Sequence, residues 1–315
     1  MVSARPLELA RLEQHWALAS IFVPLRRGPR ERLDVTVDCG RVAFRVVGPW
    51  ALGIDDLGLL LVLLRLASRL ERAAALESEP RTAIGRALAE ELDVRGVGPW
   101  ETLVIETSLR ELGRLSGRGV GGANLASIEA GLFRLAAVTV HVSGVGGSIS
   151  AHILGWAGVD AARRVRVALH PHVAAAVLGG PATLVDLASW RALRSEAARR
   201  LLVWLSAWLR EGETRSVGLD ALGHHVWAED PVGPKRASER RAKVLAALRE
   251  LDGLPNWAAV VEGRLARITR SARHFGGRSA AQRRKARGRT PERLVANRTP
   301  EQVKRREFDG ALRVS

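Results

Sequence analysis

Basic side chains crowd one short segment of the chain, residues 233–253, with the sequence GPKRASERRAKVLAALRELDG. Its first half carries a serine, Ser238, and five cationic residues: Lys235, Arg236, Arg240, Arg241 and Lys243. Ammonium and guanidinium groups bind phosphate oxygens, and arginine also reads the edge of guanine through two parallel hydrogen bonds. The chemistry that this segment predicts is therefore recognition of a polyanion.

The segment is predicted to form an amphipathic helix, with start signals at Pro234 and Ser238 and a stop signal at Gly253. At 100° per residue, Arg236, Arg240 and Lys243 share one narrow stripe, and Arg241 lies beside the apolar face, where its stem can pack. The apolar face is formed by Val244, Leu248 and Leu251. The segment alone leaves open whether the basic stripe binds phosphates or only faces solvent.

The charge of the whole chain favours a nucleic-acid partner. The 315 residues include 49 Lys+Arg and 33 Asp+Glu, for a net charge of +16. Residues 235–315 hold 22 Lys+Arg and 8 Asp+Glu, so 22 − 8 = +14 of that charge lies in the last part of the chain. A polyanionic partner is expected, and nucleic acid is favoured over a membrane surface.

Two parts of the chain follow the same predicted order: a long helix, a short helix, a turn, a second helix and a hairpin. In the first part, Ser108 is expected to cap the short helix and Gly117 to end it, whereas Asp220 is the expected cap in the second. The predicted elements of the first part are 54–75, 108–117, 123–135, 138–142 and 148–154. Those of the second part are 195–210, 219–227, 233–253, 256–261 and 264–271.

This order is typical of a winged helix-turn-helix. We therefore predict an α+β fold of two tandem winged helix-turn-helix domains with a basic, disordered C-terminal tail. The predicted divisions are an N-terminal arm (1–32), a first winged-helix domain (33–160), a second (161–273) and the tail (274–315).

The second helix of each part is the predicted recognition helix. In the second part the expected DNA contacts are Lys235, Arg236, Ser238, Arg240, Arg241 and Lys243 on the helix, and Arg264 and Arg267 in the hairpin. In the first part they are Arg118, which would hold a phosphate, Asn124 and Ser127, which would read bases, and Arg134. The recognition helix of the first part has mostly small side chains on its outer face, so this face fits either a DNA groove or another subunit. The second part is expected to be the main reader of DNA sequence.

Several enzyme classes lack their required residues. The chain has no tyrosine, which excludes a tyrosine nucleophile, and no G-x-x-x-x-G-K-[ST] stretch, which argues against a P-loop ATPase. A single cysteine, Cys39, gives no CxxC site, and the paired histidines at 170/172 and 224/225 are interpreted as structural. Adjacent Asp55 and Asp56 are interpreted as helix capping. No catalytic residue, metal or cofactor is expected.

The expected location is the cytoplasm, without a membrane partner. The N-terminus lacks a signal-peptide pattern, and a single cysteine fits a reducing compartment. The longest apolar run, residues 57–67, is shorter than the roughly 20 residues that cross a bilayer.

Five stretches of the chain, in order, resemble the IncQ-type plasmid replication initiator, the RepC family. They are LDVTVDCG (33–40), GPWALGIDDLGLLLVLLRLA (48–67), VRVALHPHVAAAVLGG (165–180), SEAARRLLVWLSAWL (195–209) and LGHHVWAED…KRASERRAKVLAALREL (222–251). Together they cover most of the sequence between residue 33 and about residue 271.

The resemblance implies a protein that binds directly repeated sites, iterons, in double-stranded origin DNA. It further implies opening of an adjacent AT-rich segment, loading of a plasmid-encoded helicase and primase, and two winged-helix domains. Two alternatives stay open, because fold does not fix function: a winged-helix transcriptional repressor and a non-specific architectural protein. A directly repeated DNA site would favour the replication initiator, and a palindromic site would favour the repressor. Whether the protein forms a homodimer stays open.

Overall fold

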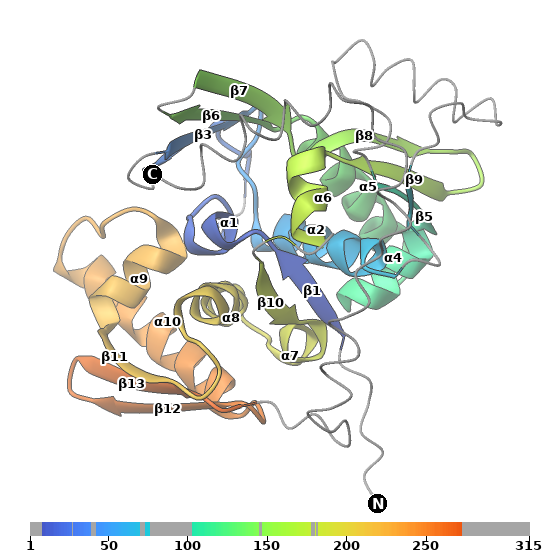
Figure 1. The fold of residues 1–315 in the computed structure, drawn as a ribbon. Helices are drawn as coiled ribbons and strands as arrows, with labels where there is room; N and C mark the ends of the chain where they lie inside the picture. The colour runs from blue at the N-terminus through green and yellow to red at the C-terminus, as the bar shows by residue number, and fades with distance from the viewer. Residues whose placement is uncertain are drawn as a thin grey trace, which may run out of the picture. The chain divides into compact units, whose positions relative to one another are not determined.

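The computed structural model describes residues 8–26, 28–38, 42–69, 73–75, 103–144, 147–177, 180 and 182–272, in a mixed α+β arrangement (Figure 1). The predicted tail and Cys39 lie outside these residues. Buried side chains from both predicted parts belong to a single hydrophobic core. The two parts, called here the first and second repeat, are therefore packed on one another through shared apolar surface.

The second repeat follows the predicted order closely. Its elements are α8 (Glu196–Trp208), β11 (Thr214–Gly218), α9 (Leu219–Trp227), α10 (Pro234–Asp252), β12 (Trp257–Glu262) and β13 (Leu265–Arg270). The three strands form an antiparallel sheet in the order β11-β13-β12, and Gly263 makes the hairpin turn with a left-handed φ of 60°. The predicted cap of α9 was wrong, because Gly218, at the end of β11, is the N-cap and Asp220 lies in the first turn.

The first repeat has the same sheet order, but reaches it through a different hairpin. Its elements are α2 (Ile54–Ala67), β5 (Leu103–Ser108), α4 (Leu109–Ser116), α5 (Gly122–Ala136), β8 (Leu154–Val159) and β9 (Arg164–Leu169). The strands β5, β8 and β9 form a sheet with β4 (Ala73–Ala75), in the order β4-β5-β9-β8. Ser108 caps α4 by accepting a hydrogen bond from the backbone N–H of Glu111, and Gly117 ends it with φ 74°, both as predicted.

The hairpin that was predicted directly after α5 forms, but in another sheet. Strands β6 (Thr139–Gly144) and β7 (Gly147–His152) continue β2 (Leu33–Asp38) and β3 (Val42–Gly48) in the order β2-β3-β6-β7. Val140 and Val142 of β6 pair with Val46 and Phe44 of β3, so their apolar alternation is satisfied there. The hairpin beside β5 is therefore β8–β9.

The long helix of the first repeat is shorter than the predicted 54–75. It ends at Ala67, where the hydroxyl of Ser68 donates to the carbonyl of Arg65, and residues 73–75 form β4 instead. Of the 14 residues of α2, 12 are buried, so this helix is surrounded by the core.

The N-terminal residues pack against elements from both repeats. Strand β1 (Leu9–Leu12) pairs antiparallel with β10 (Thr183–Asp186), and α1 (Gln14–Leu18) contacts α8. Helices α6 (Pro171–Val177) and α7 (Leu187–Ala192) lie between the repeats in the chain. These pairings cross the predicted divisions at residues 32 and 160, and the division into domains stays a prediction.

Candidate nucleic-acid interface

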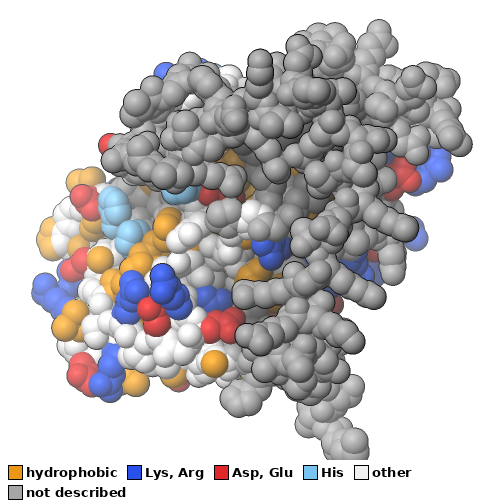
Figure 2. Space-filling model, in the orientation of Figure 1, with side chains coloured by type: hydrophobic (Ala, Val, Ile, Leu, Met, Phe, Trp, Pro, Cys, Tyr) orange, Lys and Arg blue, Asp and Glu red, His pale blue; other side chains and the backbone are white. Residues whose placement is uncertain are grey.

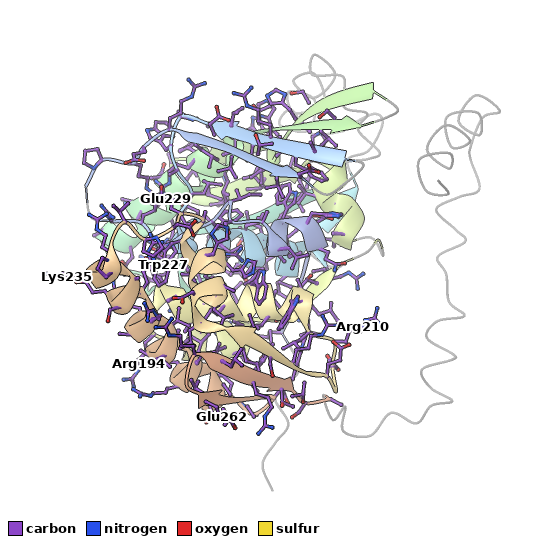
Figure 3. All side chains as sticks on the ribbon, turned by 90° about the vertical axis from the view of Figure 1, so that its left-hand side faces the viewer. Arg194, Arg210, Trp227, Glu229, Lys235 and Glu262 are labelled. Carbon is purple, nitrogen blue, oxygen red and sulfur yellow. The ribbon has the colours of Figure 1, made fainter. Side chains whose placement is uncertain are left out.

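Helix α10 separates a buried apolar face from an exposed basic one, as predicted. Val244, Leu248 and Leu251 are at most 1% exposed. Four polar side chains face outward: Lys235, Arg236, Ser238 and Lys243. Figure 3 shows Lys235 at the outer end of α10. Within the described part of the chain, the cations at 235, 236 and 243 have no ion-pair partner, so their charge is available to a ligand.

Two other predicted contacts on α10 are used to hold α9. The Arg240 guanidinium donates to the backbone carbonyl of Glu229 and lies over the Trp227 ring, 5.3 Å from its centroid. Arg241 Nε is 3.0 Å from Asp220 Oδ1, in the first turn of α9. These contacts fix the angle between α9 and α10, and so the direction in which the exposed basic side chains point.

The end of α10 is anchored to the start of α8. Glu250 Oε2 accepts hydrogen bonds from the backbone N–H groups of Arg194 (2.6 Å) and Ser195 (3.1 Å). Burial raises the pKa of Glu250, but these hydrogen bonds together outweigh it and leave the pKa below its ordinary value. The anchor leaves the basic N-terminal half of α10 exposed.

The hairpin of the second repeat adds two exposed arginines. Arg264 lies beside the turn, and its carbonyl accepts a hydrogen bond from the backbone N–H of Leu219, at the start of α9. Arg267 is exposed on β13, with Nη2 3.9 Å from Glu262. Figure 2 shows cationic side chains interspersed with acidic and hydrophobic ones on the visible face.

The four predicted contacts of the first repeat are brought together, but by an internal network. Arg118 Nη2 donates to Ser127 Oγ (2.7 Å) and is 3.2 Å from Asp55 Oδ2. The Asn124 amide donates to the carbonyl of Arg118. Arg134 Nη2 is 2.8 Å from Asp56 Oδ1. Their polar groups thus bind α2 and the turn before α5.

Asp56 is the centre of this network. Its side chain is 0% exposed, and Oδ2 accepts from Arg30 Nη1 (2.6 Å) and from the backbone N–H of Gly53 (2.9 Å). Two arginines and one N–H therefore surround one buried carboxylate, which the sequence had suggested only as a helix cap. The other exposed residues of α5 are small or apolar, and Glu129 is half-buried: the exposed ones are Gly122, Ala123, Ala126, Ala130 and Phe133.

Sequence reasoning missed three exposed arginines of the first repeat that have no ion-pair partner among the described residues: Arg110, Arg114 and Arg163. The first two lie on α4. The third lies in the β8–β9 turn with φ 60°, and its carbonyl accepts from the backbone N–H of Leu109, the first residue of α4. The basic run RRVRV at 163–167 signalled this site, but the hairpin had been assigned to residues 138–154.

A cluster of metal-ligating side chains is absent from the described residues. There, three or more His, Cys, Asp or Glu side chains never gather as a metal ion would require. His225 stacks on Trp204 with ring centroids 4.0 Å apart, and burial, Arg200 and His224 lower its pKa to about 4. Across the described ranges, the helices are all too short or too polar to span a bilayer.

Comparisons with known proteins give a family for the sequence and a solved structure of similar fold. The sequence model of the family described as Replication protein C (RepC) matches residues 4–268. A crystal structure of selenomethionine derivatives of domains 2 and 3 of RctB has a similar fold. It is 11% identical, with a TM-score of 0.53 over 82% of this chain and 99% of that one. A second structure of RctB domains 2–3 is also 11% identical, covers 79% and 93%, and has a TM-score of 0.49. No curated protein matched the sequence.

Proposed function

The chain belongs to the Replication protein C (RepC) family, and we propose from this premise that it initiates replication by binding directly repeated iterons in origin DNA. The observation that carries the proposal is the exposed basic face of α10. Its cations have no internal partner among the described residues, and its apolar face is fixed on the core. We further propose that this chain is of the IncQ type and that both repeats are winged-helix units, with α10 as the main recognition helix.

The proposed contacts in the second repeat divide by role. Arg236 and Ser238 read base edges, and Lys235 and Lys243 bind phosphates. Arg264 and Arg267 contact the backbone from the hairpin. Arg240 and Arg241 are positioning residues, because the structure ties them to α9.

The first repeat is proposed to bind the same duplex more weakly. Arg110, Arg114 and Arg163 are the proposed phosphate contacts, and the small side chains of α5 suit close approach to thymine methyl groups. Asn124 remains a proposed contact at the exposed N-terminal end of α5, and Arg118 and Ser127, which bind each other and Asp55, are proposed to position it. Arg134 is left out, because Asp56 binds it.

Binding energy, rather than nucleotide hydrolysis, would open an adjacent AT-rich segment. A plasmid-encoded helicase and primase are the proposed partners at the opened strand, and the proposed location is the cytoplasm. A homodimer on palindromic DNA would instead support a transcriptional repressor, and binding to any duplex would support an architectural protein.

The test is a footprint and titration on tandem repeats, a palindrome and scrambled DNA. We expect the protein to protect the tandem DNA sites, with one chain on each DNA site. Arg236→Ala should lower the affinity for these sites. Arg249→Ala is the matched control, because it removes the same charge from the last turn of the same helix, roughly 20 Å further along the axis. Equal affinity of the protein for all three DNAs would contradict the proposal.

A further inference from the structure

One N-terminal segment contacts both repeats; we call residues 8–23 the N-terminal strap. Its β1 pairs with β10 and contacts α2. The backbone N–H of Val23 donates to the carbonyl of Leu52, just before α2 (3.1 Å). Ser20 Oγ donates to the carbonyl of His225, in α9 of the second repeat (3.3 Å). The strap therefore joins the start of the first repeat to the helix pair of the second.

A fully buried arginine on α8 holds the centre of the strap. Arg200 is 1% exposed; Nη1 donates to the carbonyl of Ala17 (2.8 Å), and Nη2 donates to those of Leu18 (3.4 Å) and Ala19 (2.8 Å). Burial lowers its pKa to about 10, so it stays charged at neutral pH. Among the described residues, its partners are these carbonyls alone, with no carboxylate. Burying a charge is costly unless it is paired and hydrogen-bonded, and here the three carbonyls offset that cost without a counter-charge.

The contacts of Arg200 are better suited to fixing a position than to adding stability. Three consecutive carbonyls at the end of α1 carry the partial negative charge of that helix end, and the guanidinium donates to all three. Replacing buried ionic groups by apolar ones often leaves stability unchanged, whereas such groups can specify one arrangement. Arg200 thus selects one placement of α1 against α8.

Two further arginines hold the strap at its other end. Arg11 donates to the carbonyls of Ala176 (2.7 Å) and Gly180 (3.0 Å), beside α6. Arg191 of α7 pairs with Glu8 (2.6 Å) and donates to the carbonyl of Leu115 in α4 (3.1 Å). The carbonyl contacts of Arg11 thus fix the strap to α6 and the residues after it, and the Arg191–Glu8 ion pair fixes it to α7.

We propose that the N-terminal strap is a brace that holds the two repeats in one fixed arrangement, so that their DNA-facing helices engage DNA at a single spacing. Arg200 is its central positioning residue. The part that concerns DNA rests on the proposed function, whereas the brace itself does not.

The first test needs no DNA. The single cysteine is replaced by Cys39→Ser, and spin labels are placed at the exposed positions Ala130 of α5 and Ala246 of α10. We expect a single narrow distance distribution for the otherwise wild-type chain and a width at least about twofold larger for Arg200→Met. Arg45→Gln, which removes an exposed ion pair on β2–β3, is the control and should keep the narrow distribution.

Two results would overturn the brace: an Arg200→Met distribution as narrow as that of the wild type, or a wild-type distribution as broad as that of the variant. If circular dichroism shows that Arg200→Met does not fold, Arg11→Gln gives the same test from a partly exposed position.

The second test measures spacing on DNA. Five base pairs, about half a helical turn, are inserted at the centre of the protected site. We expect the wild-type affinity to fall at least tenfold on the inserted site. Arg200→Met should bind the native site more weakly than the wild type does. Its affinity should fall less than threefold when the five base pairs are inserted. Equal sensitivity of the two proteins would overturn the coupling. If the wild type failed to prefer repeats over scrambled DNA, the proposed function would fail, and the label distances would still decide the brace.

Discussion

Helices α5 and α10 occupy the same place in the two repeats, yet they use their polar side chains in opposite ways. Both bury an apolar stripe, and both are anchored near their C-terminal end to the start of the preceding long helix. In the first repeat Arg134 of α5 binds Asp56 of α2. In the second, Glu250 of α10 binds the backbone at the start of α8. The sign of the anchoring charge is reversed.

This reversal decides what each helix can present to a ligand. A carboxylate at the anchor of α10 leaves Lys235, Arg236 and Lys243 on the exposed face. The first repeat instead uses Arg118 and Arg134 on Asp55 and Asp56. A shared local plan therefore gives one basic helix surface and one apolar one. The DNA contacts of the two repeats are expected to differ accordingly.

The largest expected effect is on the anchor of the first repeat. Asp56→Asn leaves Arg30 and Arg134, whose side chains are 27% and 14% exposed, without their carboxylate. Removing one partner of a buried ion pair costs about 3–5 kcal/mol of the free energy of unfolding. Glu250→Gln should cost much less, because its amide oxygen can still accept both hydrogen bonds. Urea denaturation measures both, and equal losses would remove the contrast between the anchors.

The second prediction concerns the feature that the helices share. Leu248→Ala in α10 and Leu132→Ala in α5 each remove a side chain that is at most 1% exposed. Each should lower the free energy of unfolding by about 2–5 kcal/mol through a cavity. The exposed control Arg249→Ala should change it by less than about 0.5 kcal/mol. A loss confined to one repeat would show that the two apolar stripes are not equivalent.

The sequence predicts the helices of both repeats because their signals are local. Pro234 begins α10, Gly253 follows its end, and Ser108 and Gly117 bound α4 as expected. Strand partners depend on distant residues, and so β6–β7 was matched to the wrong sheet although its hairpin was found. The contact of Arg134 with Asp56 could not be predicted either, because the two residues lie 78 positions apart in the sequence. Periodicity places a charged residue on a helix face but does not reveal what packs opposite it.

The third prediction measures the difference in DNA contact. Arg236→Ala should cost about 1–3 kcal/mol of binding free energy on iteron DNA and much less on scrambled DNA, if it reads a base. Lys243→Ala should weaken both equally and reduce the salt slope by about one unit. On α5, Ala126→Ser should change affinity less than either. Titration over a series of salt concentrations measures all three, and unchanged binding by both α10 variants would transfer the main reading role to α5.

The smallest expected effect is a pH dependence that comes from a histidine of the second repeat. His225 of α9 stacks on Trp204 of α8, whereas α4, its counterpart in the first repeat, contains no histidine. The pKa of His225 is lowered to about 4 from 6.5 by burial, Arg200 and His224. The unfolded chain therefore binds a proton that the folded chain excludes between these values, so stability is complete above pH 6.5 and falls as the pH decreases toward 4.

Between pH 7 and pH 5 we expect the melting temperature to fall by about 1–2 °C more for the wild type than for His225→Gln, a small effect because the half-exposed ring is screened by solvent. His224→Gln is the matched control. His224 is the exposed neighbour of His225, and its replacement should leave most of the pH dependence of the melting temperature unchanged. Melting curves of the three proteins at pH 5, 6 and 7 provide the measurement. Parallel curves for His225→Gln and the wild type would show that the contact between α8 and α9 tolerates a protonated His225, and that the second repeat is no more sensitive to acid than the first.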